Sequence, residues 1–332
     1  MRIAIATDAW SPQVNGVVTT LTQTRNELIA QGHDVLMITP EGRRTVPCPT
    51  YPEIRLVLFG GRAIARELDD FKPDCIHIAT EGSIGIAVRR YCLRRGLKFT
   101  TAYHTQFPEY VRARAPIPVS WTTAALRRFH RPSSRTLVPS ESIRGVLQSR
   151  GFDNVVLWSR GVDANIFNAD ESIEYDLPGP IWAYLGRVAV EKNIEAFLDL
   201  DIAGSKVVVG DGPDFARLKA KYSDCHFVGY KFGRDLAAHL AGADVFVFPS
   251  KTDTFGIVLL EAMACGVPVA AFPVTGPVDV VRDGETGALD HDLAAACRRA
   301  LTLKSDACVK FAATRSWSRC TEHFVSHLAY NV

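Results

Sequence analysis

The amino-acid sequence predicts an α/β protein that consists of two doubly wound, Rossmann-like domains. Short runs rich in valine and isoleucine alternate with amphipathic helical stretches, which is typical of a parallel sheet with helices on both faces. This alternation occurs twice along the chain, and the length of 332 residues also favours two domains. Because open α/β sheets bind ligands beyond the carboxyl ends of their strands, we expect the domains to face each other across a cleft that holds the functional site.

The first half of the chain contains four clear strand patterns, a weaker one near Leu137, and four helical patterns. The clear strands are expected at residues 3–7, 35–39, 75–79 and 99–103. The helices are expected at residues 17–30, 61–68, 84–95 and 140–149. Gly32 follows the first of these helices and is predicted to end it.

The second half repeats the alternation. Its strands are expected at residues 181–185, 206–209, 225–228, 245–248 and 267–271. Its helices are expected at residues 193–200, 215–221, 235–241 and 257–264, with a last amphipathic helix at 316–328. The acidic stretch 168–180 contains proline and glycine and is predicted to link the halves, which places the domains at 1–165 and 166–315.

The composition excludes several classes of protein. With 47% hydrophobic and 22% charged residues, the chain is neither disordered nor fibrous. The longest apolar run, residues 255–272, contains Glu261 and Pro268 and is not expected to span a membrane. The eight cysteines form no Cys-x-x-Cys pattern and are expected to be buried thiols of a reducing compartment. The first residues read as a strand rather than a signal peptide, so we expect a cytoplasmic protein.

The net charge of +2 conceals a strong asymmetry. Residues 1–160 carry 22 Lys/Arg and 13 Asp/Glu, whereas residues 161–332 carry 16 and 23. The first half is therefore basic by nine charges and the second acidic by seven. Such a division indicates an anionic partner for the basic half.

Two loops of the second half carry candidate phosphate ligands. The first follows the strand at 181–185 and contains Arg187 and Lys192, which could clamp a diphosphate, although a charged, solvated loop is the alternative. The second follows the strand at 245–248, and its backbone amides begin a helix, where N–H groups and the helix dipole favour an anion. These amides belong to Thr254, Phe255, Gly256 and Ile257.

Two carboxylates accompany this second loop. Asp253 precedes the helix and Glu261 lies within it, and either could accept hydrogen bonds from sugar or ribose hydroxyls. The alternatives are that Asp253 merely caps the helix and that Glu261 is solvated. A dinucleotide site at Gly210 and Gly212 is not expected because a third glycine at the required spacing is missing. His323 and His327 lack the order His-Glu-x-x-His, so we expect no metal there.

The segment from Asp253 to Glu261 resembles the acid-x7-Glu motif of retaining GT-B glycosyltransferases, in particular glycosyltransferase family 4 with its lipid-modifying and mannosyltransferase members. Other motifs of that family occur in order along essentially the whole chain. They are Asn15-Gly16-Val17, Tyr103-His104-Thr105-x-Phe107-Pro108-x-Tyr110, Arg160-Gly161-Val162-Asp163, Gly186-Arg187-x4-Lys192-Asn193 and Val209-Gly210-x-Gly212-Pro213.

The resemblance implies a GT-B fold whose first domain binds the acceptor, whose second domain binds the nucleotide-sugar, and whose residues 316–332 cross back to the first domain. It implies that Arg187 and Lys192 hold the donor diphosphate in place of a metal, so that no cofactor is needed, and that Asp253 faces the hexose. The remaining implied donor contacts are the ribose at Glu261, the base at Gly229 and Tyr230, the phosphate at Gly16, and the sugar at His104.

The implied reaction retains the anomeric configuration, and the departing phosphate takes the proton of the acceptor. Two departures affect the sugar contacts. Asp253 stands where the family usually has glutamate, and residues 275–279 read Thr-Gly-Pro-Val-Asp where it usually has Gly-Gly and a glutamate.

A basic cluster in the first half indicates the acceptor. Between Arg89 and Arg150 there are 13 Lys/Arg and two acids. Cations interleaved with tryptophan suit an anionic bilayer surface, whereas no nucleic-acid reader motif is visible, and a solvated helix face is the remaining alternative. The proposed membrane residues are Arg112, Arg114, Trp121, Arg127 and Arg128.

We therefore expect a peripheral enzyme at the cytoplasmic face that moves a hexose or hexuronic acid, with a UDP-sugar preferred as donor, to a membrane lipid such as diacylglycerol. The first alternative is a GDP-mannose-dependent α-mannosyltransferase acting on a phosphoinositide or a glycan. A nucleotide-sugar epimerase of GT-B fold and a binding protein without catalytic activity are alternatives of other classes.

Overall fold

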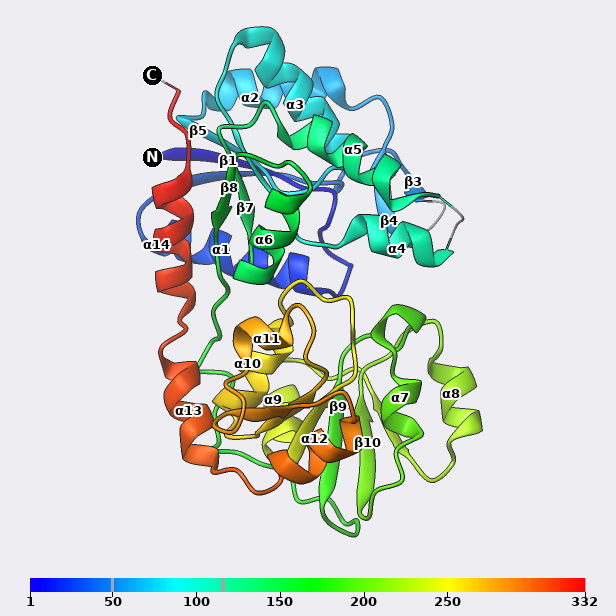
Figure 1. Ribbon diagram of the computed structural model, residues 1–332. Helices are drawn as coiled ribbons and strands as arrows, with labels where there is room; N and C mark the ends of the chain where they lie inside the picture. Colours follow the sequence, from blue (N-terminus) through cyan, green and yellow to red (C-terminus); the bar gives the residue numbers. More distant parts are fainter. Residues whose placement is uncertain (49–50, 115–116, 332) are drawn as a thin grey trace. The chain divides into compact units, whose positions relative to one another are not determined.

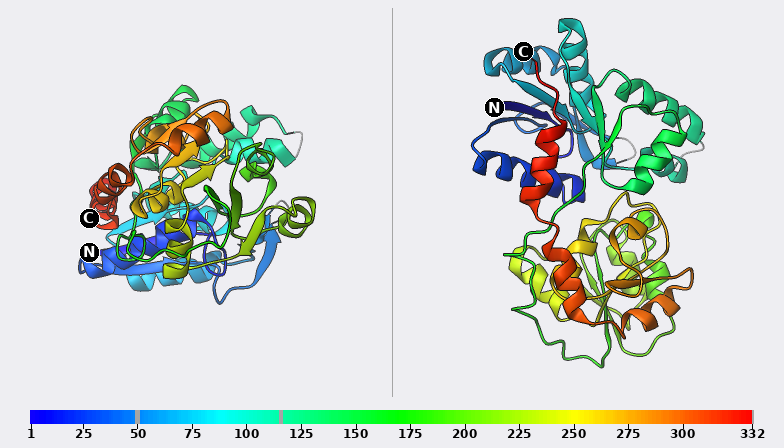
Figure 2. Two further views of the ribbon diagram at one scale, coloured as in Figure 1. Left: turned by 90° about the horizontal axis from the view of Figure 1, so that it is seen from below. Right: turned by 60° about the vertical axis from the view of Figure 1, so that its left-hand side comes forward.

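The computed structural model describes residues 1–48, 51–114 and 117–331, with the side chains of 51–53, 110, 113 and 114 left out (Figures 1 and 2). The chain forms two compact units. Unit 1 comprises Met1–Ser159 and Trp317–Val332, and unit 2 comprises Arg160–Ser316. The two units carry 22 and 16 Lys/Arg against 14 and 22 Asp/Glu, so unit 1 has a net charge of +8 and unit 2 of −6.

Unit 1 contains a parallel sheet of six strands in the order β2-β1-β5-β6-β7-β8. Its strands are β1 (Arg2–Ala6), β2 (Asp34–Ile38), β5 (Cys75–Ile78), β6 (Thr100–Ala102), β7 (Arg135–Val138) and β8 (Val155–Leu157). An antiparallel hairpin of β3 (Thr45–Cys48) and β4 (Tyr51–Val57) lies outside this sheet. The helices are α1 (Gly16–Ala30), α2 (Gly61–Phe71), α3 (Ser83–Arg95), α4 (Phe107–Arg114), α5 (Val119–His130), α6 (Glu141–Ser149) and α14 (Trp317–His327).

The alternation of side chains along β5 explains how this sheet is covered. Ile76 and Ile78 pack in one core cluster with apolar residues of α2 and α3, which lie side by side in Figure 1. His77 points to the opposite face, where its ring lies 4.9 Å from that of Phe324 on α14. The indole of Trp158 donates to the carbonyl of Cys320 at 3.2 Å. The C-terminal helix, red in Figure 2, is therefore part of the core of unit 1, as the sequence predicts.

Unit 2 contains a second parallel sheet of six strands in the order β11-β10-β9-β12-β13-β14. Its strands are β9 (Ile181–Leu185), β10 (Ser205–Val209), β11 (His226–Gly229), β12 (Val245–Phe248), β13 (Val269–Ala271) and β14 (Gly287–Leu289). Its helices are η1 (Val190–Lys192), α7 (Glu195–Leu198), α8 (Phe215–Lys221), α9 (Gly233–Ala241), α10 (Ile257–Ala264), α11 (Pro277–Val280), α12 (Leu293–Ala300) and α13 (Ser305–Ala313). Successive residues of β12 and β13 enter two separate core clusters, one on each face.

The predicted linker needs correction. The chain passes between the units at Ser159–Arg160 and again at Ser316–Trp317. Residues 168–180 pack on unit 2, where the amide of Ile173 donates to the carbonyl of Ala238 at 3.1 Å and the hydroxyl of Tyr175 lies 2.9 Å from Nδ1 of His239. Partly buried residues and hydrogen bonds thus hold a segment whose proline, glycine and acids are typical of a linker.

Several elements differ from the sequence prediction. The expected helix at 193–200 is shortened to α7, and Asn193, which adopts a left-handed conformation with φ of 52°, separates it from the turn η1. The hairpin β3–β4, the helices α4 and α5, and most elements after residue 271 were not predicted. Seven cysteines are buried as expected, and Cys48 is partly exposed. No helix within the described ranges is long and apolar enough to cross a membrane.

Candidate active site

The strand order in the sheet of unit 2 reverses at β9, and the candidate site is expected at this position. β9 lies between β10 and β12, so the connections leave it toward both edges of the sheet. At such a switch point the loops beyond the carboxyl ends of the two central strands form a crevice. The loop after β9 carries Arg187 and Lys192, and the loop after β12 carries Asp253.

The two loops are joined by an ion pair and by two hydrogen bonds. Nζ of Lys192 lies 2.6 Å from Oδ1 of Asp253. The side-chain amide Nδ2 of Asn193 donates to the carbonyl of Pro249 at 3.0 Å, and the hydroxyl of Thr252 donates to the carbonyl of Glu191 at 3.2 Å. The sequence-predicted residues Lys192 and Asp253 are therefore neighbours in space, 61 positions apart along the chain.

The second oxygen of Asp253 is a buried acceptor. Its Oδ2 has no hydrogen-bond partner among the described residues, whereas Oδ1 is taken by Lys192. A buried carboxylate oxygen without a donor is costly unless a ligand supplies one. A sugar hydroxyl is a donor of the required kind.

Glu191 was missed by the sequence analysis. Its carboxylate lies 3.6 Å from the guanidinium of Arg187, and only 5% of its side chain is exposed. The pair fixes Arg187 at the rim of the loop, where 26% of the arginine side chain remains exposed. An acid between two cations of a phosphate loop is the signal that could have identified it.

The loop after β9 rests directly on the loop after β10, and this explains the glycines that resemble a dinucleotide motif. The amide of Gly186 donates to the carbonyl of Val209 at 3.0 Å, and that of Val188 to the carbonyl of Asp211 at 2.9 Å. A Cβ atom on Gly210 would overlap the carbonyl of Gly186. The glycine therefore serves close packing behind Arg187.

The helix α10 begins at Ile257, directly after Gly256, which has a φ of 83°. The residue at the cap position is Gly256, Oδ1 of Asp253 pairs with Lys192, and its Oδ2 has no partner among the described residues, so Asp253 is not the helix cap that the alternative interpretation required. The amide groups of its first turn are the expected anion site, and they follow Asp253 by a few residues.

Glu261 lies one turn into α10 and is buried, with 8% of its surface exposed. The alternative of a solvated residue is therefore wrong. Burial raises its pKa from 4.5 to about 7. Hydroxyl groups that donate to this carboxylate would offset the cost of its burial, in keeping with the implied ribose contact.

The implied base contacts lie at the end of β11. Gly229 has a φ of 77°, and the adjoining Tyr230 is 40% exposed. The ring of Tyr230 stacks on that of Phe232 at 5.8 Å, an aromatic neighbour that sequence reasoning missed. This pair offers an apolar surface for a planar base.

Gly16 and His104 belong to unit 1. Gly16 is the first residue of α1, whose N-terminus is capped by Oδ1 of Asn15 accepting from the amides of Val17 and Val18. His104 follows β6, and its half-buried ring lies 5.8 Å from the ring of Trp158.

The switch point of unit 1 is occupied by a carboxylate of the protein itself. Asp8 follows β1 and accepts hydrogen bonds from the hydroxyl of Ser83 at 2.8 Å and the amide of Ile84 at 2.9 Å, at the start of α3. Burial raises the pKa of Asp8, although these hydrogen bonds counteract the shift. A Cβ atom on Gly82 would overlap this carboxylate. A carboxylate of the protein thus fills the helix terminus in unit 1, whereas the cap position of α10 in unit 2 is a glycine, which has no side chain to do so.

The proposed membrane residues lie on α4 and α5. Trp121 is 72% exposed, and Arg128 lies two turns further along the same face of α5. Arg112 and Arg127 are also exposed. The side chain of Arg114 lies outside the described residues.

Comparison with known proteins agrees with this geometry. Residues 14–166 match the family model of Glycosyltransferase Family 4, and residues 179–306 match that of Glycosyl transferases group 1. The sucrose-phosphate synthase of Thermosynechococcus elongatus has a similar structure, with a TM-score of 0.77, 20% identity, and coverage of 98% of this chain and 97% of the other. The fold and the loops of unit 2 thus define a glycosyltransferase of the GT-B class.

Two proteins of similar sequence show to which family of glycosyltransferases the chain belongs. A GDP-mannose-dependent alpha-mannosyltransferase of Mycobacterium tuberculosis is 31% identical over 87% of this chain and 83% of its own length. An alpha-monoglucosyldiacylglycerol synthase of Streptococcus pneumoniae is 29% identical over 92% of this chain and 79% of its own length. The chain belongs to glycosyltransferase family 4.

Proposed function

We propose that this enzyme transfers a hexosyl group from a nucleoside diphosphate sugar to a membrane lipid, with retention of configuration and without a metal. The observation that carries this proposal is the joined pair of loops in unit 2. Arg187 and Lys192 supply two positive charges from one loop, and Asp253 supplies a buried acceptor from the other.

The two cations would stabilise the diphosphate leaving group. Negative charge grows on the β-phosphate as the bond from the sugar C1 to the phosphate oxygen breaks, and fixed cations stabilise that charge more than they stabilise the substrate. Glu191 holds Arg187, and Asp253 holds Lys192, so both cations are positioned before the donor binds. Two such cations supply the charge neutralisation that a divalent ion provides in other phosphate sites.

The state of Asp253 argues against a covalent glycosyl-enzyme intermediate and supports attack by the acceptor on the face that the phosphate leaves. One oxygen of its carboxylate is paired with Lys192, which makes it a poor nucleophile toward C1 and a suitable acceptor for a sugar hydroxyl. The acceptor hydroxyl would attack C1 from the face that the phosphate leaves, and its proton would pass to the departing phosphate oxygen. The products are the glycoside and the nucleoside diphosphate, so atoms and charges balance.

The positive charge of unit 1 and one of the sequence relatives support a lipid acceptor. Unit 1 carries a net charge of +8, and α5 exposes both Trp121 and Arg128. Such residues favour the headgroup region of an anionic membrane, at the cytoplasmic face in a cell. The relative from Streptococcus pneumoniae is, by its name, a diacylglycerol-modifying synthase.

The donor has two candidates. A UDP-hexose or UDP-hexuronate is the preference from the sequence, whereas the relative from Mycobacterium tuberculosis uses GDP-mannose, as its name states. If this enzyme is a mannosyltransferase, GDP and GDP-mannose should raise its melting temperature more than UDP and UDP-sugars do. Thermal unfolding with each nucleotide and sugar nucleotide decides between the two, because a ligand that binds the folded state raises its melting temperature.

Product analysis tests the reaction itself. The preferred donor is incubated with vesicles that contain diacylglycerol or phosphatidylinositol, and the lipid products are separated and their anomeric configuration determined. An inverted glycoside, or loss of activity on removing divalent ions with a chelator, would contradict the mechanism. Turnover of the donor alone to an altered sugar would instead support the epimerase alternative.

A further inference from the structure

The joined loops after β9 and β12 contain five charged side chains. They are Arg187, Glu191, Lys192, Lys251 and Asp253. Glu191 lies 3.6 Å from the guanidinium of Arg187, and the formal charges of this pair cancel. Asp253 lies 2.6 Å from Nζ of Lys192, and the charges of this second pair cancel as well. The net positive charge of the two loops therefore comes from the fifth residue, Lys251.

The charge of Lys251 is held in place but is not neutralised. Its side chain is exposed and makes no ion pair or hydrogen bond with any residue that the structure describes. Nζ lies 4.4 Å from the centre of the ring of Phe272, which is buried. The face of an aromatic ring attracts a cation, but the ring has no net charge. Phe272 thus fixes the ammonium group and leaves its charge available to an anion.

The position of this charge is the edge of the sheet at which the phosphate loops lie. Lys251 follows β12, and Phe272 is the first residue after the neighbouring parallel strand β13. The loop after β13 also packs on the loop after β12, because a Cβ atom on Gly276 would lie 3.0 Å from the carbonyl oxygen of Asp253. Parallel strands end at the same edge of a sheet, so the loops after β9, β12 and β13 adjoin there.

We propose that Lys251 is a third cation of the donor site and binds the diphosphate of the sugar nucleotide. This inference rests on the proposed function, because it concerns the same donor. Arg187 and Lys192 are fixed by carboxylates that offset their charges, whereas Lys251 supplies the net positive charge that a diphosphate needs. That charge also stabilises the leaving group as negative charge grows on it. A lysine suits this role, since its compact ammonium group on a flexible stem can turn from the ring to a phosphate oxygen.

Calorimetric titration with a free nucleoside diphosphate tests the proposal without any transfer reaction. UDP or GDP is used, whichever raises the melting temperature more. Lys251→Ala and Lys251→Gln should each weaken its binding about tenfold or more, because a charge-assisted contact is lost. Lys251→Arg keeps the charge and should bind within about threefold of wild type. Equal weakening in all three variants would indicate a structural role and would overturn the proposal, as would unchanged affinity in Lys251→Ala.

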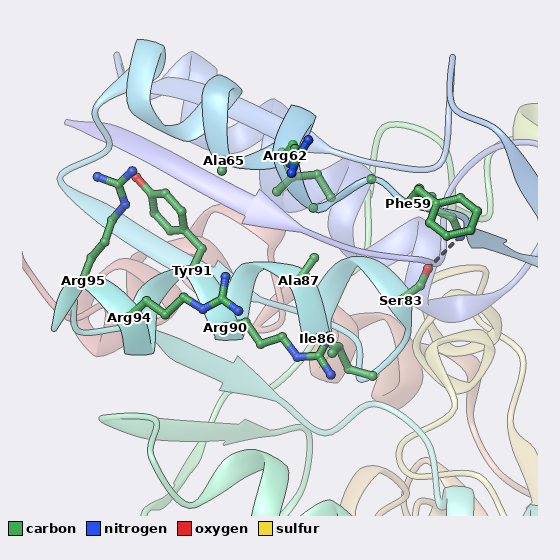
Figure 3. Close-up of a pocket in the computed structure, with 14 residues that line it drawn as sticks. Phe59, Arg62, Ala65, Ser83, Ile86, Ala87, Arg90, Tyr91, Arg94 and Arg95 are labelled. Carbon is green, nitrogen blue, oxygen red and sulfur yellow. Dashed lines mark hydrogen bonds between the residues drawn. The ribbon is translucent and has the colours of Figure 1, made fainter.

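Two other exposed cations serve as matched controls. Lys219 on α8 also lies over a phenylalanine ring, that of Phe215 at 5.8 Å, but outside the joined loops. Arg90 lines a groove of about 660 Å³ between α2 and α3 of unit 1 and, like Lys251, has no ion pair among the described residues (Figure 3). Lys219→Ala and Arg90→Ala should bind the diphosphate within about twofold of wild type. A tenfold loss in either control would show an effect of overall charge and would contradict a specific contact at Lys251.

The donor offers a second source of anionic oxygens if its sugar is a hexuronate, and a pair of donors separates the two sources. The neutral and the carboxylated sugar are compared on the preferred nucleotide, glucose and glucuronate on UDP or mannose and mannuronate on GDP. Lys251→Ala should weaken the binding of both by similar factors, because both contain the diphosphate. A loss confined to the carboxylated sugar would assign Lys251 to the sugar and overturn the proposal.

The same titrations distinguish failure of this inference from failure of the proposed function. If the wild-type protein binds the nucleoside diphosphate and Lys251→Ala binds it equally well, the role of Lys251 is wrong and the proposed donor stands. If the wild-type protein binds neither UDP nor GDP, the proposed donor itself is wrong.

Discussion

Nζ of Lys192 lies 2.6 Å from Oδ1 of Asp253, and this ion pair connects the loops that follow the two central strands of unit 2. The pair is partly buried, with 23% and 17% of the two side chains exposed, so it is less screened than a surface pair. A donor diphosphate would share Lys192 with Asp253 rather than find it unbound. Each partner thus fixes the other for the arriving substrate.

Replacing Lys192 by alanine should lower kcat/KM about 100- to 1,000-fold, because a cation directed at the leaving group is lost. It also leaves the carboxylate of Asp253 without its partner, which should weaken the hexose contact. Steady-state transfer assays with the preferred donor measure the effect. Lys219→Ala on α8, where the lysine stacks over Phe215 at 5.8 Å, is the control and should retain activity. A loss of less than about fivefold at Lys192 would remove it from the leaving-group role.

Gly210→Ala should destabilise unit 2 by about 3 kcal/mol, because its Cβ atom would overlap the carbonyl of Gly186 and its φ of 137° is unfavourable for alanine. The displaced loop carries Arg187, so nucleotide affinity should fall as well. Gly284→Ala is a matched control with φ of 79° and nothing within 4 Å of the added atom, and it should cost only about 1 kcal/mol. Melting temperatures with and without nucleotide compare the two. Equal effects would mean that backbone strain alone matters.

Glu261 should make stability fall as pH rises. Its pKa is raised from 4.5 to about 7 by burial, so the folded state holds a proton between these values that the unfolded state has released. The unfolding free energy therefore decreases across this window, by an order of about 3 kcal/mol for the whole shift. Glu261→Gln removes this dependence. Denaturant unfolding should therefore give similar unfolding free energies for wild type and variant at pH 4.5 and different ones at pH 8.

The affinity for nucleotide should also depend on the protonation of Glu261, but it should rise with pH. Ribose hydroxyls that donate to the carboxylate favour its charged form, so affinity should rise with pH up to about 7 and then level off. Calorimetric titration with the free nucleoside diphosphate measures this, and Glu261→Gln should give lower affinity without the rise. A wild-type affinity that is flat between pH 5 and 8 would exclude a ribose contact at this carboxylate.

The alternation of apolar runs and amphipathic stretches was sufficient to predict the central strands of both sheets, because buried parallel strands such as β9 and β12 are continuously apolar. The hairpin β3–β4 was missed because β3 contains Pro47 and none of its four residues is buried, so it lacks a buried pattern. Residues 168–180 were read as a linker because composition does not show that Ile173 and Tyr175 pack on α9.

The candidate site also contains both residues that the sequence predicted and residues that it did not. Arg187, Lys192 and Asp253 were predicted because they adjoin recognisable strands and helices. Asp8 was missed because its role depends on the start of α3, a partner that only the fold topology brings near. Glu191 pairs with Arg187 only four positions away in the same loop, so local spacing was sufficient to suggest it.

The α4–α5 surface makes a separate prediction for acceptor access. Trp121→Ala/Arg127→Ala/Arg128→Ala removes an exposed indole and two cations from α5. If this face meets the bilayer during transfer, KM for a vesicle-borne lipid acceptor should rise about tenfold or more, whereas donor affinity should stay unchanged because none of the three replaced residues is an expected donor contact. Ser149→Ala on α6 is an exposed control outside this face. An unchanged KM for vesicle-borne lipid in the α5 variant would contradict membrane contact through this face.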